Sequence, residues 1–351
     1  KNSFIKSGAK KKLKFMFKKN NFLCYFKKND LPEYSEFSKL IIKIKKFKPD
    51  IILGIGGGTS IDYAKLAGVI TNLKSLKNDI KFNSFKDFKK KITTIIIPTT
   101  AGTGAEETSF ATIFIKKKKY SIAHRLIKPN KFFIMPSLLL STSSYVRACS
   151  GLDTICQSTE SLLSKNSDNL SVKYAVKSLK IALKYFIPFM KKETLFNAGK
   201  MSQAANLSGK AINISKTTGP HAVSYYFSTH HGLGHGHAVA LTINSFLYFN
   251  YINLKNSNVK FSLKKRYDTL FRLTKSKSIK KINIYFKNII NKSKLEINYK
   301  KLKINIDNEI KKVVKETNVE RLGNNPILID KNNLFQVVKN NEYKNFKNIN
   351  E

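Results

Sequence analysis

The chain has 351 residues, 42% of them hydrophobic, and its 65 Lys and Arg against 22 Asp and Glu give a formal net charge of +43. Length and hydrophobic content predict a globular protein with room for two domains. The basic residues are spread along the whole chain without a nucleic-acid-binding motif, which favours compositional bias over a polyanion-binding surface. Salt-sensitive nucleic-acid binding is kept as the non-enzyme alternative, and we expect no nucleic acid as a partner.

The cysteines and the apolar runs indicate in which cellular compartment the protein is expected. Cys24, Cys149 and Cys156 are odd in number and lack paired spacing, so we expect no disulfide framework and a cytoplasmic setting. No apolar run reaches membrane-spanning length, and we expect no membrane partner. The first residues lack both a signal-peptide core and an initiator methionine, so we expect the true start of the protein to be missing.

The first part of the chain alternates between strand and helix patterns. Continuous apolar runs ending in glycine or proline indicate buried strands, and apolar residues at three- and four-residue spacing indicate helices. We predict strands over 22–26, 50–55, 92–97 and 131–134, and helices over 36–47 and 60–70. Such alternation is typical of a doubly wound parallel sheet.

Strand patterns become rare after about residue 145, where long amphipathic patterns begin. We predict helices over 152–163, 170–186, 195–211 and 238–251, and loose helical spacing over 263–315. The chain is therefore expected to hold a nucleotide-binding α/β domain over 1–144, lacking its first strand, and a helical metal-binding domain over 145–351.

Two loops of small residues follow two of the predicted strands. Gly56, Gly57 and Gly58 stand between a strand and a helix, where backbone N–H groups and the helix dipole can approach an anion, and we expect a positive φ at Gly57. The loop 98–106, PTTAGTGAE, follows the next strand. Both loops are suited to line a nucleotide crevice. A tight turn without a ligand is the alternative for each.

Five of the six histidines lie within 17 residues, from His221 to His237. His221 and His235 are 14 residues apart, and Asp153 and Gln157 share one face of a predicted helix. One carboxylate and two imidazoles can hold a divalent ion and leave positions open for a substrate. The alternatives are an N-cap or surface role for the acid and structural roles for single histidines.

Five motifs are distributed along most of the chain, from residue 56 to residue 326. They are GGGTSIDYAK (56–65), PTTAGTGAE (98–106), SGLDTICQSTES (150–161), HAVSYYFSTHHGLGHGHAVAL (221–241) and ERLGNNP (320–326). They resemble the iron-dependent alcohol dehydrogenase family, which shares its fold with glycerol dehydrogenase and dehydroquinate synthase. The resemblance implies a dehydroquinate synthase-like α/β plus all-α fold: a Rossmann-like parallel-sheet domain followed by a helical domain. It is also consistent with a homodimer, which we expect.

The resemblance further implies two cofactors, NAD or NADP and a divalent metal, Fe²⁺ or Zn²⁺. The expected cofactor-binding residues are Gly56, Gly57, Gly58, Thr59, Ser60, Asp62, Thr99, Thr100 and Thr103. The expected metal ligands are Asp153, Gln157, His221 and His235. Two positions depart from the family: Gln157 stands where a histidine ligand is usual, and Met135 where an aspartate is usual. An amide oxygen is a weaker ligand than an imidazole, so iron affinity is in question.

The implied activity is hydride transfer between NAD(P)H and an aldehyde beside the metal. The motifs are most similar to the phosphonoacetaldehyde reductase branch, which implies reduction of phosphonoacetaldehyde to 2-hydroxyethylphosphonate. Lys210 and Lys216 precede His221 and could pair with a phosphonate, although a role as surface charge is equally expected. His231, between the two ligands in sequence, is the candidate proton donor. The alternatives are a dehydroquinate synthase-type lyase and a glycerol dehydrogenase-type polyol oxidoreductase.

Overall fold

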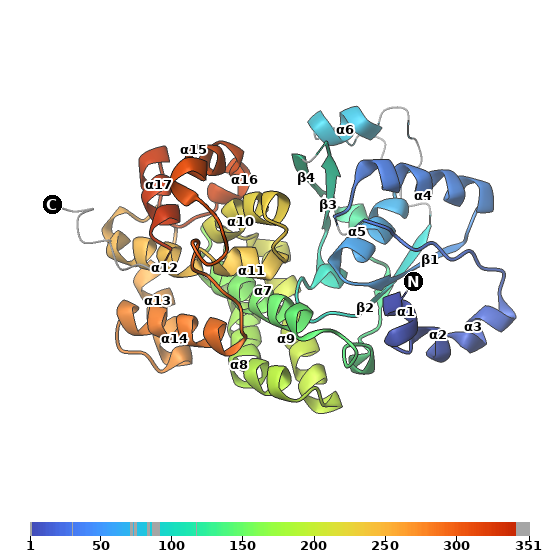
Figure 1. The fold of residues 1–351 in the computed structure, drawn as a ribbon, viewed down its shortest axis with the longest axis horizontal. Coiled ribbons are helices and arrows are strands. Elements are labelled where there is room, and N and C mark those ends of the chain that lie inside the picture. The colour runs from blue at the N-terminus through green and yellow to red at the C-terminus, as the bar shows by residue number, and fades with distance from the viewer. Residues whose placement is uncertain are drawn as a thin grey trace.

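The protein folds into a sheet-containing part and a helical part, which lie side by side in Figure 1. The computed structural model describes residues 2–29, 31–70, 73, 76–82, 85, 92–116 and 118–341. This arrangement confirms the predicted fold class, a parallel sheet followed by a helical domain. Over those ranges, no helix has the length and apolar character needed to cross a bilayer.

A parallel sheet of three strands forms the centre of the first part. The strands are β1 (Ile51–Gly56), β2 (Thr93–Pro98) and β5 (Lys131–Phe132), in the order β1-β2-β5. They confirm the strands predicted over 50–55, 92–97 and 131–134 to within two residues. The register pairs Gly56 with Pro98. The two loops rich in small residues therefore leave the sheet at the same edge.

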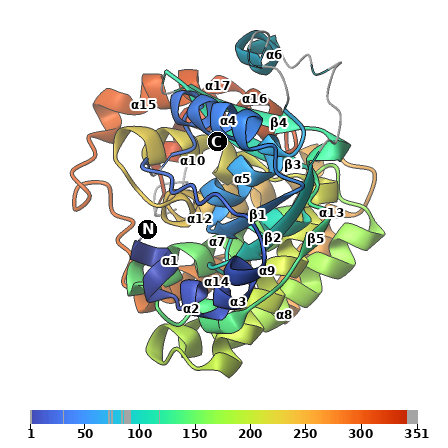
Figure 2. The same cartoon turned by 90° about the vertical axis from the view of Figure 1, so that its right-hand side faces the viewer.

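The predicted burial of β1 is only partly correct. Ile51 is 54% exposed and only Gly54 of this strand is fully buried, because β1 lies at one end of the described strand order. Helix α5 (Gly58–Ala67) follows β1 and packs against it, and helix α4 (Tyr34–Phe47) packs against α5. Both helices were predicted, and Figure 2 shows them near the strands.

The strand predicted over 22–26 is wrong. Residues 21–28 form no regular element, and the chain there is fixed by other contacts: the carboxylate of Glu36 accepts hydrogen bonds from the backbone N–H groups of Lys28 and Asn29. A strand needs a partner backbone, and this segment is instead held by one side chain. Phe22 is 49% exposed, which a buried strand would not allow.

Several short elements were not predicted. Helices α1 (Asn2–Lys6), α2 (Ala9–Lys12) and α3 (Lys14–Lys19) precede the sheet, and Leu13 shares a small core with Ile97 of β2. Helix α6 (Leu76–Phe82) precedes β2. Strands β3 (Phe110–Ile115) and β4 (Lys118–Ala123) form an antiparallel hairpin. The lysine run at 116–119 hid this hairpin, because it interrupts the apolar pattern that predicts strands.

Helices make up the second part. They are α7 (Ser144–Leu163), α8 (Asn169–Lys191), α9 (Leu195–Ser215), α10 (Gly219–His230), α11 (His235–Ala240), α12 (Ile243–Ile252), α13 (Leu263–Thr274), α14 (Ile279–Lys292), α15 (Ile306–Glu316), α16 (Val319–Leu322) and α17 (Lys331–Lys339). Helix α7 is buried along most of its length and packs against α8, α9 and α11. It therefore offers a rigid element on which to build a site.

Two helix predictions need correction. The helix predicted over 238–251 is two helices, because Thr242 has non-helical φ and ψ of −121° and −4° and ends the first one. The helix predicted from 152 begins eight residues earlier, since the hydroxyl of Ser143 caps it by accepting from Val146 N. Helix α10, which carries His221, was not predicted as a helix at all.

Candidate active site

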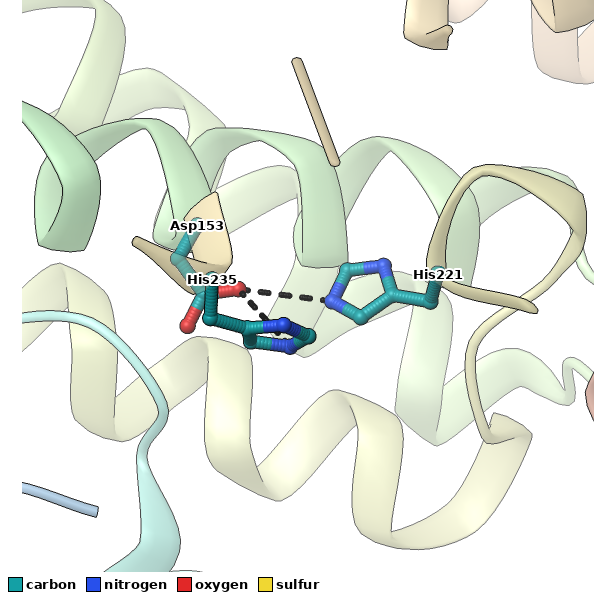
Figure 3. Close-up of side chains that lie close together, drawn as sticks. All are labelled: Asp153, His221 and His235. Atoms are coloured by element: carbon teal, nitrogen blue, oxygen red, sulfur yellow. Dashed lines mark hydrogen bonds and ion pairs between the residues drawn. The ribbon is translucent and has the colours of Figure 1, made fainter. Parts of the chain in front are cut away.

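Three predicted metal ligands come together from three helices. Asp153 lies on α7, His221 on α10, and His235 is the first residue of α11. Their ligand atoms all lie within 4.8 Å of one another. Asp153 Oδ1 is 3.3 Å from His221 Nε2 and 3.9 Å from His235 Nε2, and Figure 3 shows both imidazoles directed toward the carboxylate.

The local sequence explains how His235 reaches α7. Gly236 follows it, and a Cβ there would lie 1.9 Å from the carbonyl oxygen of Cys149 on α7. Only glycine permits so close an approach of the two helix backbones. Helix α11 therefore lies directly against α7, with the side chain of His235 beside Asp153.

Glu160 is a residue of this site that the sequence analysis missed. It lies on α7, seven residues after Asp153, and its Oε2 accepts the hydrogen bond of His221 Nδ1. Its Oε1 accepts from Thr218 N at 2.9 Å, Thr218 Oγ1 at 3.0 Å and His221 N at 3.3 Å. One buried carboxylate thus holds both the start of α10 and the ring of His221. The signal available was the seven-residue spacing on one helical face.

The charges of the three ligands differ. Burial raises the pKa of Asp153, but His235 and His221 outweigh burial, so the pKa of the carboxyl lies below its usual range. Burial also opposes the charged form of His221, yet Glu160 and Asp153 raise the pKa of this imidazole to about 10. Enclosure by the protein lowers the pKa of His235 to about 3, although Asp153 opposes this and a third of the side chain stays accessible. A buried carboxylate and two imidazole nitrogens aimed at one point form a donor set that fits a divalent ion.

Gln157 lies one turn from Asp153, as predicted, but its amide is engaged. Its Oε1 accepts from Ser208 Oγ at 3.0 Å, and its side chain hydrogen-bonds Asp153, which helps to lower the pKa of that carboxyl. In this orientation the amide oxygen faces α9 rather than the ligand atoms. A ligand role for Gln157 stays a prediction.

A cavity of about 200 Å³ joins the two small-residue loops to the metal ligands. It is lined by Gly57, Gly58, Thr100, Gly102, Thr103, Tyr145, Val146, Cys149, Ser150, Asp153, Gly234, His235 and Gly236. Gly57 is the N-cap of α5 and Gly58 begins the helix, so the positive end of the helix dipole faces the cavity. An anionic group fits there on charge and space.

The expected positive φ at Gly57 is wrong. Gly57 has φ −79°, and the residue that needs glycine is Gly56, with φ +152°. A Cβ on Gly56 would lie 2.7 Å from the side chain of Ser60, whereas one on Gly57 would make ordinary contact with Thr100 at 3.5 Å. Gly56 therefore makes the turn, and Gly57 leaves room at the cavity wall.

Some of the predicted cofactor residues do not reach the cavity. Gly56, Thr59, Ser60, Asp62 and Thr99 are not part of the cavity lining. The N–H of Thr99 donates to Gly56 O at 3.0 Å, which joins the two loops. Asp62 accepts from Thr112 N of β3 at 2.9 Å, and burial raises its pKa to about 6 despite Lys65 nearby. Their direct contact with a cofactor stays a prediction.

The remaining histidines of the cluster point elsewhere. His231 Nε2 bonds Glu309 of α15 at 2.7 Å and His230 Nε2 bonds Glu316 at 2.8 Å, and neither lines the cavity. The sequence predicts His231 as the proton donor because it lies between the two ligands in the chain. The geometry does not support this role. The side chain that does reach the cavity is Tyr145, whose hydroxyl accepts from Gly234 N and lies 3.4 Å from His237 Nδ1.

The two candidate phosphonate-binding lysines lie in different surroundings. Lys210 Nζ lies 3.5 Å from Glu107 Oε1, so it has a carboxylate partner, which it shares with Lys128. Lys216, at the end of α9, lies instead over the ring of Phe110, with Nζ 4.8 Å from its centroid. Met135 packs against the small core around Leu13, where an apolar side chain suits the surroundings.

Comparison with known proteins agrees with this geometry. Residues 1–136 match the family described as iron-containing alcohol dehydrogenase, and residues 147–341 match its C-terminal domain family. The chain is 29% identical over 219 residues to a phosphonoacetaldehyde reductase of Streptomyces viridochromogenes, covering 60% of this chain and 55% of that one. It is 27% identical over 213 residues to the 1-propanol dehydrogenase PduQ of Citrobacter freundii, covering 60% and 54%. The matches thus span about half the length of these relatives.

Solved structures share the fold. A sulfoacetaldehyde reductase from Bifidobacterium kashiwanohense in complex with NAD⁺ superposes with a TM-score of 0.84, at 23% identity, over 96% of this chain and 88% of that one. An iron-containing alcohol dehydrogenase from Thermococcus thioreducens gives 0.85, at 20% identity, over 97% and 91%. The family matches cover most of the chain and include all three clustered ligands, and the protein is therefore a member of the iron-containing alcohol dehydrogenase family.

Proposed function

We propose that the protein is a metal-dependent, NAD(P)H-linked aldehyde reductase that also oxidises the corresponding alcohol. One observation carries this proposal: a single cavity is lined at one side by Gly57 and Gly58 and at the other by Asp153 and His235. A nicotinamide cofactor bound at the glycine turn and a substrate oxygen beside the metal ligands would share this space. Hydride transfer requires such direct contact.

The metal would be held by Asp153, His221 and His235. Both Fe²⁺ and Zn²⁺ accept two imidazoles and one carboxylate, and three protein ligands leave a position open for substrate. When bound, the ion supplies Lewis-acid polarisation of a carbonyl oxygen. Glu160 fixes the ring of His221 with Nε2 toward Asp153, the arrangement in which a carboxylate orients a metal-binding histidine.

The cofactor would be held by the first turn of α5. Free N–H groups at a helix start bind a pyrophosphate, and Gly57 and Gly58 let it approach. Thr100 and Thr103 also line the cavity, next to these glycines: a Cβ on Gly57 would lie 3.5 Å from Thr100 and one on Gly58 3.1 Å from Thr103. NAD and NADP both fit this geometry, and the NAD⁺ complex of the sulfoacetaldehyde reductase supports a nicotinamide in general.

The cavity holds no activated nucleophile among the residues that line it. Cys149 is the one thiol there, and burial raises its pKa to about 11, so it stays protonated at neutral pH. Hydride transfer needs no covalent intermediate with the protein, which agrees with this environment. All three cysteines are free thiols, as the proposed cytoplasmic setting requires.

The substrate proposal is narrower than the reaction proposal. The relatives named above act on phosphonoacetaldehyde and 1-propanol according to their names, so a short aldehyde is the substrate class we propose. Phosphonoacetaldehyde, giving 2-hydroxyethylphosphonate, is our specific candidate. A homodimer is also part of the proposal, and sedimentation of the purified protein tests it.

The test uses purified protein that is stripped of metal with a chelator and then reloaded with Fe²⁺ or Zn²⁺. NADH and NADPH consumption is followed by nicotinamide absorbance with propanal and phosphonoacetaldehyde. We expect metal-dependent consumption with at least one aldehyde, and its loss in Asp153→Asn. Reduction of neither aldehyde in any metal-loaded sample contradicts the proposed function.

A further inference from the structure

Three basic side chains from distant parts of the sequence lie close enough for the charge of one of them, Arg321, to act on the other two. Lys119 lies on β4, Lys216 at the end of α9, and Arg321 on α16. We name them the basic cluster. Phe110 joins two of its members, with the Arg321 guanidinium 5.0 Å and Lys216 Nζ 4.8 Å from its ring centroid.

Arg321 is the buried member of the basic cluster. It is 5% exposed, and its Nη2 donates to Ser121 Oγ at 3.3 Å. Its Nη1 is buried without a hydrogen-bond partner in the part of the chain that the structure describes. A guanidinium nitrogen is a strong donor, and leaving it unpaired inside a protein is costly. A ligand with acceptor oxygens would remove that cost.

No carboxylate among the described residues forms an ion pair with the basic cluster. Among the described residues, no carboxylate lies within 4.0 Å of Lys119, Lys216 or Arg321, whereas Lys210 nearby has Glu107. Burial lowers the pKa values of both lysines, and the charge of Arg321 lowers them further. Glu320 acts on Lys216 and Asp62 acts on Lys119 only from beyond ion-pair distance, so the like charges are held together without a close counter-ion.

Lys216 is held in place by its backbone. Its φ of 60° and ψ of −179° lie in a region that is almost exclusive to glycine, and its Nζ donates to Asn213 O at 3.3 Å. The ammonium group has three donors, so two remain for a ligand. Strain of this kind is common where a side chain must point to a binding site.

The basic cluster adjoins the proposed metal site through Tyr225. Lys119 Nζ lies 3.3 Å from the centroid of the Tyr225 ring, and that ring stacks on His235 with centroids 6.1 Å apart and planes 15° apart. Arg321 and Lys119 are also near enough for their charges to act on His235. The basic cluster therefore lies beside the cavity described above rather than among its lining residues, one aromatic ring away from His235.

We propose that Lys119, Lys216 and Arg321 form a subsite for the anionic tail of the aldehyde, and that the tail is a tetrahedral dianion of the phosphonate class. The inference rests on the proposed reductase function, which supplies the aldehyde end. It uses one of the two lysines suggested by sequence and leaves out Lys210, which forms an ion pair with Glu107.

The number and type of donors favour a dianion. Guanidinium matches the oxygen geometry of phosphate-like groups, and such charge-assisted hydrogen bonds are stronger than neutral ones. A phosphonate carries between one and two negative charges at neutral pH and can lose its second proton beside cations, whereas a sulfonate or carboxylate carries one charge at most. Three cations without a carboxylate at ion-pair distance are better balanced by that tail than by a singly charged sulfonate or carboxylate.

The test compares three aldehydes of similar size: phosphonoacetaldehyde, sulfoacetaldehyde and propanal. The proteins are wild type, Lys216→Ala, Arg321→Lys, Arg321→Leu and, as a matched control, Lys200→Ala, a lysine on the same helix that contacts Tyr185 and Phe196. Calorimetric binding of 2-hydroxyethylphosphonate and fluorescence titration of NADH give readouts besides turnover. Arg321→Lys keeps the positive charge and Arg321→Leu removes it. Circular dichroism checks that both variants are folded.

We expect Lys216→Ala to lower kcat/KM for phosphonoacetaldehyde by at least about tenfold, which corresponds to one lost interaction of about 1.4 kcal/mol. Propanal turnover and NADH affinity should stay unchanged, as should all values in Lys200→Ala. Arg321→Leu should weaken binding of 2-hydroxyethylphosphonate more than Arg321→Lys does.

Three results would overturn the inference while leaving the proposed function intact. The first is a wild type that reduces propanal as well as phosphonoacetaldehyde. The second is equal preference for sulfoacetaldehyde, which would show that a single charge suffices. The third is loss of NADH binding in Lys216→Ala, which would assign the basic cluster to a cofactor phosphate. Failure with every aldehyde would instead contradict the proposed function itself.

Discussion

Glu160 holds the Nδ1 side of His221, so the Nε2 atom of the same ring faces Asp153. The two carboxylates lie seven residues apart on α7, about two helical turns. One buried helix therefore supplies both a candidate metal ligand and the residue that orients a second ligand. The site depends on this helix more than on the histidine-rich segment that first indicated it.

Replacing Glu160 by glutamine should weaken metal binding without removing a ligand. The amide lacks the charge that supports His221, and loss of an orienting group typically costs about 10- to 100-fold in metal affinity. Competition with a chromophoric chelator measures this affinity. Glu316→Gln, on the surface beside His230, is the matched control and should bind metal normally. Equal affinities in the two variants would count against the role of Glu160.

Replacing Gln157 by histidine should tighten metal binding. The position lies one helical turn from Asp153, and an imidazole is a better ligand than an amide. We expect a gain of at least about tenfold, or about 1.4 kcal/mol, in the same chelator competition. The double variant with Ser208→Ala separates ligation from the lost hydrogen bond to Ser208. Unchanged affinity in both variants would place residue 157 outside the ligand set.

The glycine turn makes two separable predictions. Gly56→Ala should destabilise the protein by about 1–3 kcal/mol, because residue 56 has φ +152°. Gly57→Ala should leave stability nearly unchanged yet weaken NADH binding about tenfold, since its methyl group enters the cavity. Urea unfolding and NADH fluorescence titration measure the two effects. The reverse pattern would show that the cofactor does not use this turn.

His231→Ala tests which histidine matters for chemistry. Because His231 bonds Glu309 outside the cavity, we expect unchanged kcat and a loss of about 0.5–1.5 kcal/mol in the free energy of unfolding. Steady-state kinetics with propanal and urea unfolding measure the two quantities. A large fall in kcat with unchanged stability would restore His231 as the proton donor predicted from sequence.

The parts of the fold with strong local patterns could be predicted from the sequence. The strands around Gly56 and Pro98 are short continuous apolar runs that end in glycine and proline, and this combination favours a strand. The segment at 22–26 has the same apolar character, but strand formation depends on a partner backbone that sequence alone does not reveal. The β3–β4 hairpin was missed for the opposite reason, since Lys119 interrupts its pattern.

The candidate site, like the fold, could be predicted from the sequence only in part. Asp153, His221 and His235 could be chosen because ligand chemistry and motif spacing agree. Arg321 could not, since a lone arginine carries no signal until the fold shows what it faces, and the only signal for Glu160 was its seven-residue spacing from Asp153. For His231, proximity in sequence was misleading, because helix α10 ends there and turns the ring toward α15.

Metal content is the most direct measurement of the central claim. Protein expressed with iron or zinc is dialysed and analysed for bound metal per chain, in wild type, His235→Ala and the surface control His230→Ala. Asp153, His221 and His235 form one site, so wild type and His230→Ala should each hold one divalent ion per chain, and His235→Ala should hold little. A His235→Ala variant with the full metal content of the wild type would contradict the account.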